Sequence, residues 1–158
     1  MSKVDVETVF TKAVAAFKSE LTDAIDSINN DKGDFELPQI DNESWVEGSL
    51  DEKVINYDQA VFAFVDDIQV VVEGNAVSKN VVIEFDLMCN QRADFLDYKR
   101  VLRYQRALEE AAVNSWDTFL RGYDRGSVRL LTPVDIKLFN ASFYTKVIGI
   151  QIEFNLVN

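Results

Sequence analysis

The residues in this chain that could carry catalysis are carboxylates, and two of them are regularly spaced. Glu84 and Asp86 alternate with apolar residues between Val81 and Cys89, so they share one face of an expected strand, about 7 Å apart. Two carboxylates at that separation could act as a general acid and base. The spacing is also common on solvated strand faces, and we favour that interpretation.

Other catalytic and metal-binding chemistry finds little support. The chain has no histidine, the commonest general base and the commonest zinc ligand. It contains no Walker loop and no dinucleotide-binding glycine motif, and a serine nucleophile would lack its base. Asp31, Asp34 and Glu36 do not have the spacing of a calcium-binding EF-hand. We therefore predict that the protein is not an enzyme and holds no cofactor or metal.

The composition indicates one globular domain spanning residues 1–158. With 47% hydrophobic residues the chain can build a core, while its net charge of −11 is atypical of a nucleic-acid binder. The single cysteine, Cys89, cannot form an internal disulfide, which suits a reducing compartment. No signal peptide and no apolar run of 18 residues is present, so no membrane contact is expected.

The charge is unevenly distributed along the chain. Residues 1–77 hold 17 acidic and 5 basic residues, a net charge of −12, whereas residues 78–158 hold 10 and 11, a net charge of +1. Acidic residues concentrate in 31–58, for which we predict a long loop with short strands near 44–47 and 53–57. The candidate acidic surface consists of Asp31, Asp34, Glu36, Asp41, Glu43, Glu47, Asp51 and Glu52.

Every arginine lies between Arg92 and Arg129, and arginine is well suited to protein interfaces. The candidate interface residues are Lys99, Arg100, Arg103, Arg106, Arg121, Arg125 and Arg129. Pairing of an acidic face with an arginine face of the next copy would generate a ring if the rotation closes. The alternatives are an ordinary solvated helix face and acidic loops that only keep the protein soluble.

These side chains must be positioned by two helices and several strands. Apolar residues recur at helical spacing in 4–28 and again in 92–113, where Phe95, Tyr98, Val101, Leu102, Leu108 and Ala112 form the predicted apolar side. Alternating patterns predict five strands, at 60–65, 68–72, 81–89, 134–139 and 148–156. The connections that we predict between these elements are a turn or bulge at 66–67, a turn at 73–75 and a polar loop over 116–133. The predicted fold class is α+β: an antiparallel sheet with a mixed edge and both helices packed on one face.

This order of elements resembles the tail terminator and tail-completion, or neck, proteins of long-tailed bacteriophages. The resemblance rests on an N-terminal amphipathic helix (Val6–Ile28), then the strands AVFAFV (60–65) and VVIEFDL (81–87). A helix containing RVLRYQRAL (100–108), an arginine-containing loop and a last strand with IQIEFNL (150–156) complete it. The resemblance covers most of the chain, and it is based on the order of the elements and not on a catalytic motif. The acidic stretch 31–58 is longer than the family leads us to expect.

The resemblance implies a structural virion protein that forms a homo-oligomeric ring, typically a hexamer, at the junction of tail and head. Such a ring caps the tail tube, stops its polymerisation and joins it to the head-completion or connector protein. DNA passes through the lumen without specific binding, and the particle is assembled in the host cytoplasm. The alternatives are another neck, connector or baseplate subunit of a virion, or a small acidic protein-binding adaptor.

Overall fold

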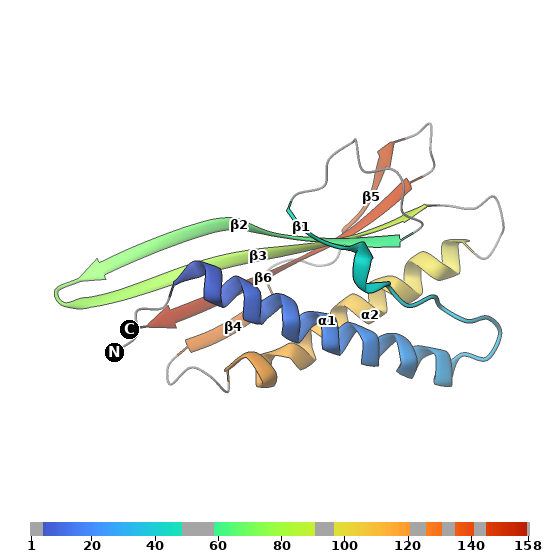
Figure 1. Cartoon of the computed structure of the whole chain (residues 1–158), viewed down its shortest axis with the longest axis horizontal. Helices are drawn as coiled ribbons and strands as arrows, with labels where there is room; N and C mark the ends of the chain where they lie inside the picture. Colours follow the sequence, from blue (N-terminus) through green and yellow to red (C-terminus); the bar gives the residue numbers. More distant parts are fainter. Residues whose placement is uncertain are drawn as a thin grey trace.

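The computed structural model describes residues 5–48, 59–90, 97–120, 126–130, 135–140 and 145–157. Two long helices, α1 (Val6–Asp31) and α2 (Asp97–Leu120), lie side by side and run in opposite directions across one face of a sheet (Figure 1). The described residues therefore form the α+β architecture that the sequence predicts, with both helices on the same face.

The first helix begins where a side chain satisfies its free backbone donors. Asp5 is the N-cap, and its carboxylate accepts hydrogen bonds from the Thr8 backbone N–H at 3.0 Å and from the Thr8 hydroxyl at 2.5 Å. These bonds to the ionised form, the hydroxyl bond first, lower the pKa of Asp5. One stripe of α1 is buried: Val9, Ala13, Ala16, Phe17, Leu21, Ala24, Ile25 and Ile28.

The described residues contribute six strands to one sheet. They are β1 (Trp45–Glu47), β2 (Gln59–Glu73), β3 (Ala76–Asn90), β4 (Gly126–Leu130), β5 (Asp135–Asn140) and β6 (Thr145–Val157). The order is β1-β2-β3-β6-β4, and β5 also pairs with β6. All pairs are antiparallel except β1 with β2, so the predicted mixed edge is confirmed at β1. A short 3-10 helix, Asn42–Ser44, leads into β1.

The predicted strands 60–65 and 68–72 are one continuous strand, β2. The pairing with β3 shifts between Val65 and Asp67, so Asp66 is the extra residue of a bulge within the strand, and no turn separates two strands here. The chain turns later, at Gly74-Asn75, where Gly74 has φ of +61°. A glycine tolerates this left-handed conformation, which lets β2 and β3 form one long hairpin.

The core lies between the two helices and the sheet. Phe17 of α1 stacks on Phe85 of β3 with ring centroids 3.9 Å apart, and it forms a T-shaped pair with Trp45 of β1, with ring centroids 6.3 Å apart. Cys89 is buried on the same face of β3, as its alternation predicts. From α2, Tyr104 and Leu108 complete this layer with no exposed surface.

Three predictions for the second half of the chain are wrong. The second helix, predicted over 92–113, continues to Leu120. The buried Ser115 donates its hydroxyl proton to the Ala112 carbonyl (3.1 Å) and so is satisfied inside the helix. The region predicted as the loop 116–133 also contains strand β4. The pattern predicts Tyr98 and Leu102 on the apolar side, yet they are 63% and 41% exposed. Phe95 lies outside the described residues.

Within the described ranges, neither helix is apolar enough over a sufficient length to cross a membrane. The long loop predicted over 31–58 begins later than expected, because Asp31 is still the last residue of α1. A strand near 44–47 is confirmed as β1, whereas the strand predicted near 53–57 lies outside the described residues.

Candidate interaction sites

The segment between α1 and β1 is held against both helices; we call residues 33–41 the strap. Asn29 of α1 binds it as a neighbouring strand would, because its side-chain oxygen accepts from the Leu37 N–H (2.7 Å) and its NH₂ donates to the Leu37 carbonyl (3.0 Å). These bonds allow the Leu37 side chain to be fully buried in the core. Gln39 donates to the Thr22 carbonyl and to the Asp26 carboxylate, at 3.1 and 2.8 Å.

The strap is also fixed from α2. The buried Tyr104 donates its hydroxyl proton to the Pro38 carbonyl at 2.8 Å, and its removal from water raises the pKa of Tyr104. A long loop with no side-chain anchors would be free to move, but this part of the acidic stretch has a fixed position. The strap can therefore present its charges at defined places.

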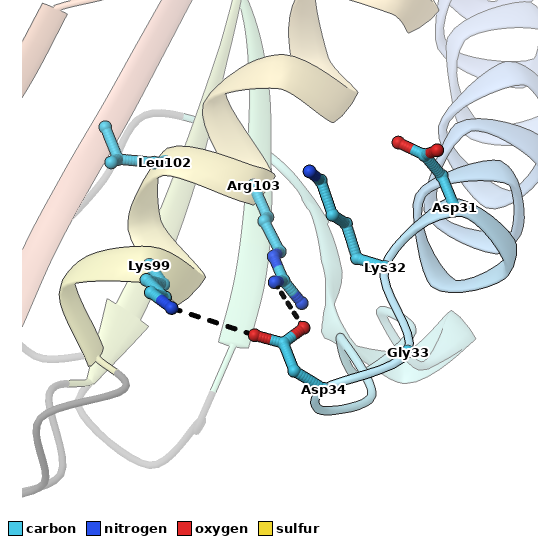
Figure 2. A pocket seen from close by; sticks show the side chains of 7 residues that line it. All are labelled: Asp31, Lys32, Gly33, Asp34, Lys99, Leu102 and Arg103. Atoms are coloured by element: carbon cyan, nitrogen blue, oxygen red, sulfur yellow. Dashed lines mark hydrogen bonds and ion pairs between the residues drawn. The ribbon is translucent and has the colours of Figure 1, made fainter.

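One end of the strap meets α2 in a charged cluster, shown in Figure 2. The Arg103 guanidinium donates to the Asp34 carboxylate at 2.6 Å and to the Phe35 carbonyl at 3.3 Å, and it lies 3.8 Å from the centre of the Phe35 ring. Lys99 approaches the same carboxylate at 3.8 Å. The Arg103 side chain is only 11% exposed, and its hydrogen bond holds the pKa of Asp34 below the usual range.

A second ion-pair group lies one turn further along α2. Arg106 donates to Glu110 on its own helix at 3.0 Å and to Asp31 at the end of α1 at 3.3 Å. The Glu110 bond and then the Asp31 bond raise the pKa of Arg106. The structure thus brings two predicted acidic residues and three predicted interface cations together within one chain. Contacts of these cations with another copy stay a prediction.

This cluster borders an open hollow of about 480 Å³ at the junction of α1, the strap and α2. Its lining residues are Asp31, Lys32, Gly33, Asp34, Lys99, Leu102 and Arg103. Three cations and two carboxylates leave a local net charge of +1, in a chain whose net charge is −11. The hollow is therefore a place where an acidic group is favoured over a basic one.

The rest of the predicted surface is dispersed or lies outside the described ranges. Four acidic residues are exposed on the strap, on the 3-10 helix and at β1: Glu36, Asp41, Glu43 and Glu47. Arg100 is partly buried on α2. Arg129 belongs to β4, opposite Glu153 in the register. Asp51, Glu52, Arg121 and Arg125 lie outside the described residues.

The second candidate site, which the sequence pattern does not reveal, is the far part of the β2–β3 hairpin. We call residues 66–80 the arm; it extends to the hairpin turn, at one end of the molecule (Figure 1). Its apolar side chains are exposed: Ile68 46%, Val70 54%, Val71 43% and Val72 65%. The valine-rich pattern predicts a strand, but only the sheet order shows that this strand lies at the edge.

The outer edge of β2 carries little pairing. Strand β1 pairs only with Val61–Ala63, so no described strand pairs with this edge of β2 beyond Ala63. Natural edge strands are usually protected by lysine, proline, bulges or covering elements. The bulge at Val65–Asp67 protects the start of this edge, whereas the run Ile68–Val72 contains no charge and no proline.

The carboxylate pair Glu84 and Asp86 lies on the sheet face opposite the helices. Gln151 donates to Glu84 at 2.7 Å and to the bulge residue Asp66 at 3.2 Å, so one amide links two carboxylates. Asp86 lies over Gly149 of β6, where an added Cβ would approach its carboxylate oxygen to 2.7 Å. Among the described residues, no group of three or more acidic or cysteine side chains is placed to hold a metal ion.

A scan of the chain against protein-family models finds no match, and a search of the curated proteins finds none either.

Proposed function

We propose that this protein is a structural assembly subunit that forms a closed ring of identical copies, as a phage tail terminator does. In that role the ring caps the tail tube, stops its polymerisation and offers a surface to the head-completion or connector protein. The resemblance in element order supports this role, and the α+β architecture of the described residues is the one that the resemblance implies.

The observation that carries the proposal is the arm. Four aliphatic side chains in five consecutive residues are 43–65% exposed along an edge that no described strand covers. Exposed apolar patches of this kind mark protein–protein contacts, and an exposed apolar edge strand is an aggregation hazard unless it is covered. An assembled ring would bury the arm and remove that hazard.

The charge fits a ring through which DNA slides. In the proposed ring the acidic face of each copy, in a chain of net charge −11, lines the lumen, where it repels phosphates and prevents retention of the DNA. The exposed residues Glu36 and Asp41 of the strap and Glu43 of the 3-10 helix contribute to that surface. That the acidic face of the subunit lines the lumen is part of the proposal.

Electron microscopy of the purified protein, alone and with tail tubes of its own phage, tests the role. We expect closed rings in the first sample and density at one end of tubes of uniform length in the second. Tubes that grow without limit in the presence of the protein would refute capping. Rings that bind the portal or the baseplate instead would favour the alternative of another neck, connector or baseplate subunit.

A further inference from the structure

The two outer edges of the sheet, formed by β2 and β4, lie at the same level along the strands. No described strand pairs with the outer edge of β2 beyond Ala63 or with the outer edge of β4 (Figure 1). The pairings through β3 and β6 connect these edges in two rows: Asp67, Val82, Glu153 and Arg129, and then Gln69, Asn80, Asn155 and Ser127. Two copies that stand side by side therefore bring β4 of one next to the arm of the other without a shift along the strands.

The strand directions match as well. Each step from β2 to β3, from β3 to β6 and from β6 to β4 is antiparallel, so β4 runs opposite to β2. A second copy in the same orientation would therefore set its β2 antiparallel to β4 of the first, with both edges able to exchange backbone hydrogen bonds. Such a contact is heterologous, and it produces a ring when the rotation closes.

Both edges have apolar residues on the helix side of the sheet. Ile68 lies on this side because it pairs with the core residue Val81. Val128 lies on the same side because it pairs with the core residue Phe154. In a pairing without a shift, Val128 of one copy takes the position opposite Ile68 of the next. The exposed aliphatic row of the arm then continues the apolar side of the neighbour's sheet.

The opposite side of the sheet carries complementary charges at the two edges. The exposed Asp67 lies on this side because it pairs with Val82, which alternates with core residues. Arg129 is on the same side, opposite Glu153 in the register. Pairing without a shift places Arg129 opposite Asp67 of the next copy, and opposite charges across two strands stabilise their pairing. A shift of two residues in either direction separates them, so level and charge select the same register.

A symmetric pairing of two arms fits less well. Antiparallel pairing of two β2 edges around Val70 would set Asp67 of each copy against Glu73 of the other, and like charges directly opposite are destabilising. Pairing around Val71 would leave both carboxylates without a cation opposite them. The edge of β4 is the better match for the arm.

We infer that β4 of one copy pairs with the arm of the next as an added antiparallel strand, with Arg129 opposite Asp67 and Gly126 opposite Val70. This contact rests on the self-assembly proposed above and names the two edges that join the copies. It also covers the run Ile68–Val72, whose outer edge would otherwise be an aggregation hazard.

Disulfide formation tests the register. Gln69→Cys and Ser127→Cys are combined in one chain, because these positions face each other across the inferred contact. Within one chain three strand spacings of about 4.8 Å separate them, too far for a disulfide, which needs Cα atoms about 4.4–6.8 Å apart. Mild oxidation should therefore give a ladder of covalent multiples of 18.0 kDa, and the buried native Cys89 should give none.

Val71→Cys combined with Ser127→Cys is the matched control, because Val71 lies two residues further along the same face of the arm. We expect few covalent products from it. Equal ladders from the two combinations would overturn the inferred register. Covalent dimers from Gln69→Cys or Val71→Cys without Ser127→Cys would show a symmetric pairing of arms and would also overturn it.

Charge reversal gives an independent readout by sedimentation velocity. Asp67→Lys should raise the concentration needed for assembly about tenfold, because it opposes two cations, and adding Arg129→Glu should restore part of the loss. Glu73→Lys, the same charge change on the same face outside the paired rows, should have little effect.

Two results separate this contact from the ring itself. Rings that form equally well with Asp67→Lys and give no disulfide ladder would refute the contact and leave the ring standing. An unsubstituted chain that stays at 18.0 kDa at every concentration would refute both.

Discussion

Replacing Asn29 by alanine should release the strap from α1. The change removes two hydrogen bonds, of 2.7 and 3.0 Å, to the Leu37 backbone, and each such bond contributes about 0.5–1.5 kcal/mol net. It also leaves the Leu37 N–H and carbonyl without their partner in a partly buried place, which adds to the cost. We expect a loss of about 2–3 kcal/mol in the free energy of unfolding.

The neighbouring residue supplies the control. Asn30 is the same residue type on the same helix, but it is exposed, so Asn30→Ala should cost less than about 0.5 kcal/mol. Urea denaturation followed by circular dichroism measures both variants at one protein concentration. For a chain of this length, a loss of 2 kcal/mol corresponds to a fall in Tm of about 4–8 °C.

Hydrogen exchange locates the effect. In Asn29→Ala, amide exchange should rise in the strap at Leu37 and its neighbours while β3 stays protected. Equal stability of the two alanine variants, or exchange that rises uniformly over the sheet, would refute the reasoning that this side chain fixes the strap.

Three further changes test other parts of the structure. Tyr104→Phe, which removes the hydrogen bond to Pro38, should lower the free energy of unfolding by about 1 kcal/mol, and a cost near zero in urea denaturation would contradict the strap contact. Phe17→Ala should cost about 3–5 kcal/mol in the same assay, because it empties the centre of the core; a loss below 1 kcal/mol would count against the stacking on the sheet. Asp34 should titrate below its ordinary value of 3.8 in an NMR pH titration, and Arg103→Gln should return its pKa toward normal. Because the pKa of Asp34 is lowered in the folded state, the stability that this pair contributes is complete above the unfolded-state pKa and is lost as pH falls through the folded-state pKa. An Asp34 pKa in Arg103→Gln equal to that of the unsubstituted protein would contradict the pairing.

Local patterns in the sequence were enough to predict the sheet and the first helix. Alternation over Val81–Cys89 and Ile148–Leu156 predicts β3 and β6, and the stripe around Phe17 predicts α1, because each of these elements buries one regular face. The end of α2 could not be predicted in this way. Asn114-Ser115 resembles a helix stop, and only the buried bond from Ser115 to the preceding turn shows that the helix continues.

The candidate sites depended on long-range contacts. The sequence shows an arginine-rich helix, but it does not show the intramolecular partners of these arginines. Arg103 pairs with Asp34, 69 residues earlier, and Arg106 pairs with Asp31, 75 residues earlier. The exposure of Val70 and Val72 could not be inferred either, because a valine run predicts a strand without fixing whether it lies at the centre or the edge. Only the strand order distinguishes the two.

Self-assembly into a closed ring is the central claim, and the mass of the protein in solution tests it most directly. Sedimentation velocity across a wide range of protein concentrations should show one discrete species at a fixed multiple of 18.0 kDa. Val70→Glu combined with Val72→Glu should shift that species toward the monomer, while Val113→Glu should not. A wild-type protein that remains at 18.0 kDa throughout the range, or an open-ended series of masses with no limit, would contradict the account.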